Sequence, residues 1–323
     1  MESRCPRAPS TRSGSRTPRD GGPFGATIEI VLGDDPVTVL LAAGPQIHWD
    51  PLALAPISVL VAIYVRRFRR ARTEGRGRDG RVRGAGAAQA VAFAAGVTAL
   101  ALALATPLDG LGEDYLFSAH MFQHVLLGDI APALLLLSLS RVIMRPVTRR
   151  LMRVERALGP LANPWTAIAL WIGLMYLWHV PAMYDAALRN PLIHVVEHAS
   201  FFTAGLVVWW PLIGPVPMRR RLTGLSTVAY IGTAKFGLAA LGLYLTWSND
   251  LLYDYYAEVP RIWGLSPVGD QNAGGAIMMV EQSFTFVIAL VILFAAMLTQ
   301  SETDELRRER LEDAPPAPRP RSA

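Results

Sequence analysis

The segment SAHMFQHVLLGDIAPALLLLSLS, residues 118–140, decides the fold of this chain. From His120 onward it is apolar over about 20 residues, the length that an α-helix needs to cross roughly 30 Å of hydrocarbon. Its first turns nevertheless carry His120 and His124, and Asp129 follows nine residues after His120. Polar groups are costly in lipid and usually face the interior of a helix bundle. The segment therefore predicts a membrane-crossing helix with one polar face turned towards its neighbours.

Similar apolar runs recur along the rest of the chain. Of its 323 residues, 52% are hydrophobic and 18% are charged, a composition too apolar for an ordinary soluble domain. Runs of about spanning length lie at residues 85–105, 164–178, 192–213, 227–247 and 273–298, with a shorter one at residues 51–65. Together with residues 120–140, they predict an all-α, polytopic membrane protein built as a bundle of seven transmembrane helices.

The arginines predict the orientation of this bundle. The connections after the first, third and fifth predicted spans are rich in arginine, as is the segment after the last span. The alternate connections are acidic or nearly neutral. Arginine-rich loops lie in the cytoplasm by the positive-inside rule. We therefore expect the N-terminus outside and the C-terminus in the cytoplasm, as an odd number of spans requires.

The chain is predicted to have three parts. Residues 1–45 are rich in serine, proline, glycine and arginine, which is typical of disorder. This extension carries five arginines, although the loops place it outside the cell, where the positive-inside rule does not expect them. We therefore interpret the extension as the product of a start codon assigned too early, with the functional chain beginning near Val37. Residues 46–300 form the predicted membrane domain, and residues 301–323 a disordered, charged cytoplasmic tail.

All six histidines fall at the predicted outer ends of spans: His48, His120, His124, His179, His194 and His198. Two pairs have i, i+4 spacing, which places both rings on one helix face about 6 Å apart, close enough to share one metal ion. Glu197 lies on the same helix face as the second pair. It is a candidate metal ligand, or it could accept a hydrogen bond from a histidine that binds the metal. A lone histidine at a span end is more often an interfacial anchor, but two pairs on one side favour a shared metal or haem site.

The cysteine and methionine content limits which metal ion the site could hold. Cys5 is the only cysteine, so the chain cannot form an internal disulfide or a multi-thiolate metal site. Met278 lies in the outer third of the last predicted span, and thioether with imidazole suits copper better than it suits a hard cation. The competing interpretation is that Met278 simply fills space between helices.

Three ionisable residues are predicted near the middle of the membrane: Asp129, Lys235 and Glu281. Such groups usually pair with one another, and a packing role is favoured over a proton or ion path. At the entry to the last span, Asp270 is a plausible N-cap. The Gly274-Gly275 pair that follows allows a close approach to a neighbouring helix.

Taken in order, five motifs resemble the CtaG family of cytochrome c oxidase assembly proteins over residues 46–300. They are HWDP at His48, HMFQHVLLGDIAP at His120, WHVPAMYDAAL at Trp178, HVVEHASFFTAGLVVWWPLIGP at His194 and DQNAGGAIMM at Asp270. The resemblance implies a multi-pass protein of the bacterial plasma membrane that is needed to make active haem-copper oxidase of the caa3 type. It implies a copper chaperone and not an enzyme, with oxidase subunits and membrane lipid as partners and no nucleic acid.

Other functions fit parts of the same pattern. Histidines from neighbouring helices can be axial ligands of haem, which would make this chain a membrane cytochrome. Lys235, Glu281 and Asp129 could line the path of a transporter, although no inverted repeat is evident. A retinal Schiff base at Lys235 would leave the histidines unexplained. A scaffold that binds no metal remains the main alternative among assembly factors.

Overall fold

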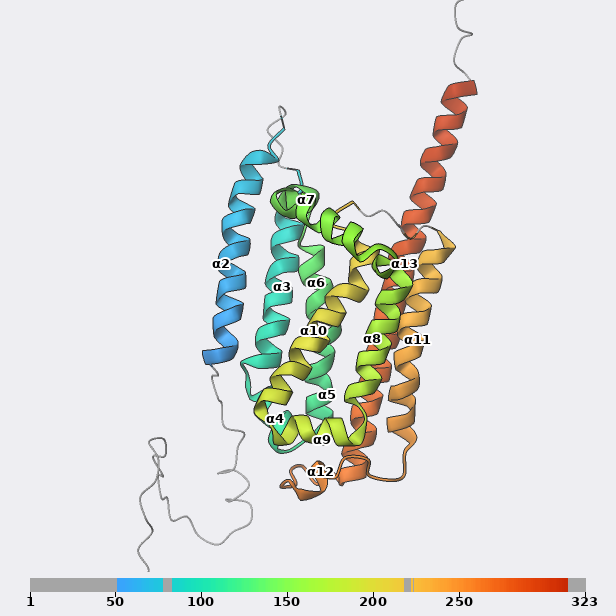
Figure 1. Cartoon of the computed structure of the whole chain (residues 1–323). Coiled ribbons are helices and arrows are strands. Elements are labelled where there is room, and N and C mark those ends of the chain that lie inside the picture. Colours follow the sequence, from blue (N-terminus) through green and yellow to red (C-terminus); the bar gives the residue numbers. More distant parts are fainter. Residues whose placement is uncertain (1–50, 78–82, 218–221, 223, 313–323) are drawn as a thin grey trace, which may run out of the picture. The chain divides into compact units, whose positions relative to one another are not determined.

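The computed structural model describes residues 51–77, 83–217, 222 and 224–312, which form helices and no β-strand (Figure 1). The predicted all-α class is therefore confirmed for this part of the chain. The helices that run along the bundle pack side by side, and α13 contacts both α11 and α5 while α10 contacts α8 and α6. These helices are α2 (Pro51–Glu74), α3 (Ala87–Leu104), α5 (Phe117–Val125), α6 (Ala131–Leu137), α8 (Pro164–Trp178), α10 (Pro191–Ile213), α11 (Leu225–Trp247) and α13 (Pro267–Glu312).

The described helices provide five or six candidate membrane spans, where the sequence predicted seven. Five segments are long and apolar enough to cross a membrane. A sixth is added if α8 and α9 (Pro181–Arg189), which meet at 72°, form one broken span. Helix α2 is not among these candidates; its apolar stretch ends at Val65, and the arginine-rich sequence RRFRRAR follows within the same helix.

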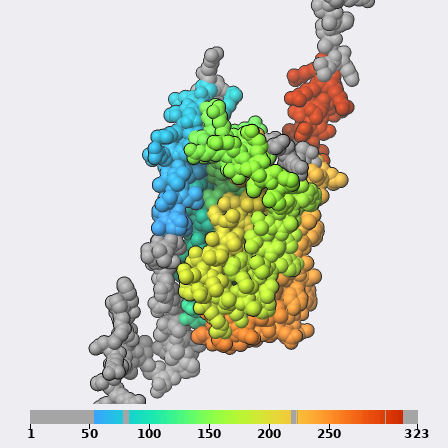
Figure 2. Space-filling view, in the orientation of Figure 1, coloured from blue at the N-terminus to red at the C-terminus, as the bar shows by residue number. Residues whose placement is uncertain are grey.

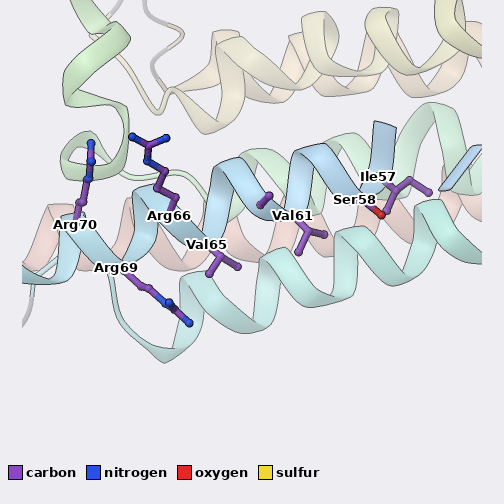
Figure 3. Close-up of a pocket in the computed structure, with 8 residues that line it drawn as sticks. Ile57, Ser58, Val61, Val65, Arg66, Arg69 and Arg70 are labelled. Atoms are coloured by element: carbon purple, nitrogen blue, oxygen red, sulfur yellow. The ribbon is translucent and has the colours of Figure 1, made fainter. Parts of the chain in front are cut away.

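Helix α2 nevertheless packs on the bundle. The Tyr64 ring stacks on that of Phe93 in α3 with 3.6 Å between ring centroids, and its hydroxyl donates to the Ser138 carbonyl at 3.1 Å. Arg67 Nε donates to the Ile143 carbonyl of α7 (Arg141–Leu158) at 2.7 Å. Figure 3 shows apolar residues along α2 with arginines towards its C-terminal end, namely Ile57, Val61 and Val65, then Arg66, Arg69 and Arg70.

The span that begins at Phe117 is interrupted by a π-helical segment, η1 (Leu126–Ile130), between α5 and α6. Pro132 has no N–H to donate to the carbonyl of Gly128 four residues earlier, and such a missing bond favours a local change of helix type. The Gly128 carbonyl packs against Gly205 of α10, where an added Cβ would lie 1.9 Å from that oxygen. Helix α10 and the interrupted span therefore meet in direct backbone contact.

Replacing Gly205 by alanine is expected to lower the free energy of unfolding by about 1–3 kcal/mol, the usual cost of overpacking a tight interior. The new methyl group would meet a backbone oxygen, which cannot rotate away, so α10 and η1 would have to separate. Thermal unfolding in detergent measures the loss. Gly173→Ala in α8 is the matched control, because a Cβ there meets no atom within 4 Å. An equal loss in both variants would contradict the importance of the contact.

Helix α13 differs from its predicted bounds at both ends. It begins at Pro267 and continues to Glu312, so residues 301–312, which were predicted to be disordered, are helical. This stretch is rich in Glu, Leu and Arg, which favour helix, and Arg307 Nη1 lies 3.9 Å from Asp304 Oδ1. The close approach expected at Gly274-Gly275 occurs, since a Cβ on Gly274 would lie 2.4 Å from Phe117 and one on Gly275 would lie 2.6 Å from the Thr246 nitrogen.

Helices that run across the bundle cover its two ends (Figure 1). Helix α7, which carries arginines at residues 141, 145, 149, 150, 153 and 156, crosses one end, near the arginine-rich end of α2. Helices α4 (Pro107–Asp114), α9 and α12 (Tyr255–Glu258) lie at the opposite end. The histidines on α5 and α10 lie towards the α4, α9 and α12 end, opposite the arginines of α7.

Candidate metal centre

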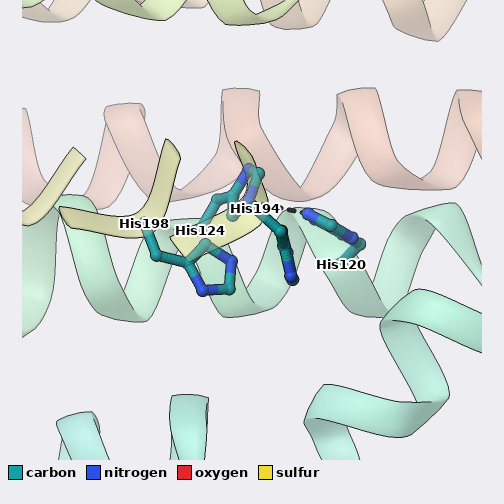
Figure 4. Close-up of side chains that lie close together, drawn as sticks. All are labelled: His120, His124, His194 and His198. Carbon is teal, nitrogen blue, oxygen red and sulfur yellow. Dashed lines mark hydrogen bonds between the residues drawn. The ribbon is translucent and has the colours of Figure 1, made fainter. Parts of the chain in front are cut away.

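Four histidines form one tight cluster between α5 and α10: His120, His124, His194 and His198 (Figure 4). One ring nitrogen from each can be chosen so that all four lie within 4.8 Å of one another. This group is called the histidine cluster below. Within the pairs, ring centroids are 4.2 Å apart on α5 and 4.0 Å apart on α10, and the two pairs approach to 5.3 Å. The i, i+4 spacing in each helix and the backbone contact at Gly205 bring the pairs together.

The cluster has buried nitrogens that lack protein partners. Nε2 of His194 and Nε2 of His198 are buried and accept no hydrogen bond. Nε2 of His120 and Nε2 of His124 lie 2.7 Å apart, so one of them must hold the proton that the other accepts. An unsatisfied buried polar atom costs about 1–3 kcal/mol. A cation held between the four rings would satisfy these lone pairs.

The spacing suits a small tetrahedral site. With metal–nitrogen bonds of about 2.0–2.1 Å, tetrahedral ligand nitrogens lie about 3.4 Å apart. The 2.7 Å contact would have to lengthen slightly, and the widest separations, up to 4.8 Å, would have to shorten. Small rotations of four rings on fixed helices could achieve both changes. Ligands composed only of imidazole suit zinc, copper, iron and nickel.

Glu113 of α4 orients one of the candidate ligands. Its Oε1 lies 2.7 Å from Nδ1 of His194, so Nδ1–H is the donor and Nε2 keeps its lone pair. Helix α4 also packs directly on the cluster, because a Cβ on Gly112 would lie 2.9 Å from the His120 Cα. Sequence reasoning placed Glu113 only in an acidic outer loop, since no local spacing connects it with His194.

Asp270 fixes the start of α5, which carries two cluster histidines. Its Oδ2 accepts the Phe117 N–H at 2.7 Å, and its Oδ1 accepts the Ser118 N–H at 3.1 Å. These are unpaired N–H groups of the first turn of a helix, which an aspartate stabilises. The prediction that Asp270 caps the last span is wrong, because α13 already begins at Pro267. Asp270 instead ties α13 to the N-terminus of α5.

Aromatic side chains cover the site at the α4, α9 and α12 end of the bundle. The Tyr256 hydroxyl donates to the Gly112 carbonyl at 2.7 Å, and the Tyr253 hydroxyl donates to the His179 carbonyl at 3.2 Å. Burial raises the pKa of both tyrosines, so each hydroxyl keeps its proton. Phe117 stacks on Tyr253 with ring centroids 5.0 Å apart. Figure 2 shows the side chains of α8, α9 and α10 closing one face of the bundle.

The other predicted ligands lie outside the cluster. His179 follows α8, and its Nδ1–H donates to the Met175 carbonyl at 2.7 Å, while its Nε2 is buried without a partner. His179 is not a member of the histidine cluster, so the shared site predicted from the histidines does not include it. The Phe201 ring centroid lies 4.6 Å from that of His124 and 6.4 Å from that of His179. Glu197 is buried but is not a member of the cluster, and His48 lies outside the described residues.

A polar network lies deeper in the bundle. Lys235 of α11 forms an ion pair with Asp129 of η1, and its Nζ lies 3.7 Å from Glu281 Oε1 of α13. Trp209 Nε1 of α10 donates to Asp129 Oδ1 at 2.5 Å. The π-helical turn thus presents Asp129 to three neighbouring helices. Sequence reasoning identified the three charged residues but not Trp209.

Comparison with known proteins identifies the family to which this arrangement belongs. The family described as cytochrome c oxidase caa3 assembly factor (Caa3_CtaG) matches residues 62–300. An uncharacterized protein of Mycobacterium leprae (strain TN) is 27% identical over 224 residues, which cover 62% of this chain and 32% of the relative. Uncharacterized proteins of Mycobacterium bovis and Mycobacterium tuberculosis are each 26% identical over 218 residues.

The match spans about a third of the length of these curated relatives, 32% in each case. No solved structure matches the chain significantly.

Proposed function

Because this chain belongs to the cytochrome c oxidase caa3 assembly factor family, we propose that it binds copper at the histidine cluster and hands it to an oxidase subunit. Copper is the cargo of this protein, and no reaction is catalysed. The observation that carries the proposal is the set of four imidazoles whose ligand nitrogens lie within 4.8 Å of one another in the bundle interior. His120, His124, His194 and His198 are the proposed ligands.

The compactness of the cluster favours a bare ion over haem. On each helix the second imidazole lies 4.0–4.2 Å from the first, between ring centroids, so it occupies the space that a porphyrin would need beside an axial ligand. A haem would require the two helices to move apart, against the backbone contact between Gly128 and Gly205. Imidazole accepts either oxidation state of copper, and ligands that can be exchanged one at a time suit transfer to a partner.

The proposed orientation places the cluster at the outer face of the bacterial plasma membrane. Arginines gather at the α7 end of the bundle, and acidic residues, including Glu113, gather at the α4 end with the histidines. Under the positive-inside rule the arginine end is cytoplasmic. With α2 counted as a short first span, the chain crosses the membrane seven times and ends in the cytoplasm. Copper would then enter from outside, beneath the aromatic side chains of Phe117, Tyr253 and Tyr256.

A deletion strain tests this function in the cell. Membranes from the strain should contain oxidase with its haem but with reduced copper, and the intact gene should restore the copper. A gene encoding His194→Ala and His198→Ala should not restore it. Val195→Ala with Val196→Ala is the matched control, because both valines lie between the same histidines and are 64% and 59% exposed. Full oxidase copper with the histidine variant would support a scaffold without metal.

Glu113→Gln is expected to weaken Cu(I) binding about 10–100-fold, because groups that orient a metal-bound histidine typically contribute that much. The amide keeps the size of the side chain but removes the charge that holds the Nδ1–H of His194. Competition with a chromophoric Cu(I) chelator measures the change. Glu258→Gln is a control, because Glu258 is an exposed acid at the same end whose partner is Arg189. Equal affinities for Glu113→Gln and the unmodified protein would contradict the role of Glu113.

A further inference from the structure

A small cavity lies beside the histidine cluster and extends towards the buried ion pair. Its volume is about 20 Å³, enough for about one water molecule or one dehydrated ion. His124 lines it, and so do Asp129 and Glu281 of the deeper network. The cavity therefore lies between the histidine cluster and the network of Asp129, Lys235 and Glu281.

Three methionines from three different helices line this cavity: Met121 of α5, Met175 of α8 and Met278 of α13. Each is at most 5% exposed. A methionine in a helical bundle is ordinarily a flexible space filler. Here, however, the three side chains surround a space that they leave unfilled.

His179 adds an imidazole to the same cavity. Its Nδ1–H is held by the Met175 carbonyl at 2.7 Å, which leaves the lone pair on Nε2. That nitrogen is buried and has no partner, although the ring lines the cavity. His179, which lies outside the histidine cluster, is thus a candidate ligand for an ion in this cavity.

The ligand types around the cavity favour a soft cation. Asp129 and Glu281 contribute two carboxylates, and Lys235 is the ammonium that pairs with them. Thioether and imidazole ligands select soft ions, Cu(I) above all, over hard divalent ions. The volume admits a single ion without its hydration shell, which again favours a monovalent ion because it loses less hydration energy than a divalent one.

We propose that this cavity is a second, deeper Cu(I) position, with Met121, Met175, Met278 and His179 as candidate ligands. His124 borders both positions, so an ion leaving the histidine cluster would exchange imidazole for thioether without passing through lipid. The inference rests on the proposed copper-handling function and adds to it a second ion and a sulfur ligand set.

The test is the copper content and X-ray absorption spectrum of the purified full chain after Cu(I) loading. We expect two Cu(I) ions per chain and sulfur among the scattering neighbours. Replacing the three methionines together by leucine, which nearly preserves their volume, should remove one ion and the sulfur signal. Met279→Leu is the matched control, because Met279 neighbours Met278 but does not line the cavity. His194→Ala with His198→Ala should retain one ion with sulfur neighbours.

The outcomes separate the two proposals. One ion with nitrogen neighbours alone, unchanged by the leucine substitutions, would overturn the deeper position and leave the histidine cluster intact as a site. A sulfur signal that survives the three substitutions would also overturn it. Failure of the unmodified chain to bind any copper would overturn the proposed function itself.

Discussion

Replacing His120 and His124 together by alanine is expected to reduce the Cu(I) affinity of the histidine cluster by more than about 100-fold. Loss of a group that only orients a ligand already costs about 10–100-fold, and this variant removes two ligands. The remaining pair on α10 would be held in place by Glu113, which lies 2.7 Å from His194, but it would offer only two nitrogens. Competition with a Cu(I) chelator measures the affinity.

The control must show that the variant still folds. His120 and His124 are 0% and 7% exposed, so their loss also leaves space in the interior. Size-exclusion behaviour in detergent and helical circular dichroism should match those of the unmodified protein. If the folded variant keeps its affinity for Cu(I), the histidine cluster is not the binding site.

Replacing Lys235 by methionine is expected to lower the free energy of unfolding by about 3–5 kcal/mol, because it leaves a buried carboxylate without its countercharge. Asp129 is 2% exposed and its ion-pair partner is Lys235, with Trp209 and Gln282 as hydrogen-bond donors. Thermal unfolding in detergent measures the loss.

Adding Asp129→Asn to the Lys235→Met variant should recover part of that stability, because the uncompensated charge is then removed. The difference between the double variant and the sum of the single variants measures the coupling of the pair. A double variant less stable than Lys235→Met alone would contradict the assignment of Asp129 as the countercharge.

Local sequence signals predicted the bounds of several helices. Helix α8 begins at Pro164, as predicted, because Asn163 Oδ1 accepts the Trp165 N–H at 3.1 Å and proline is favoured in the first turn. Helix α10 begins in the same way at Asn190-Pro191. Periodicity also placed the rings of His120 and His124 on one helix face, and those of His194 and His198 on another.

Contacts between distant segments could not be predicted in the same way. Asp270 caps a helix that begins 153 residues earlier in the chain, and only the packing of α13 on α5 brings them together. Glu113 has no sequence spacing that indicates His194 as its partner. The exclusion of His179 depends on where Phe201 and Tyr184 pack, which is a property of the tertiary structure.

Pro132 follows Gly128 by four residues, and this spacing marks a carbonyl without its helical hydrogen bond. The resulting π-helical turn contains Asp129, and its Gly128 carbonyl forms the backbone contact with Gly205. A proline within a predicted span is therefore a signal for a local change in helix geometry beside a polar residue.

The central claim is that the four clustered histidines hold copper, and the most direct test combines copper content with a visible spectrum. The full chain, purified in detergent and loaded with Cu(I), should retain copper through gel filtration and show no Soret band. The variant lacking His120 and His124 should lose the copper of the cluster. A Soret band, or an unmodified protein that retains no copper, would contradict the account.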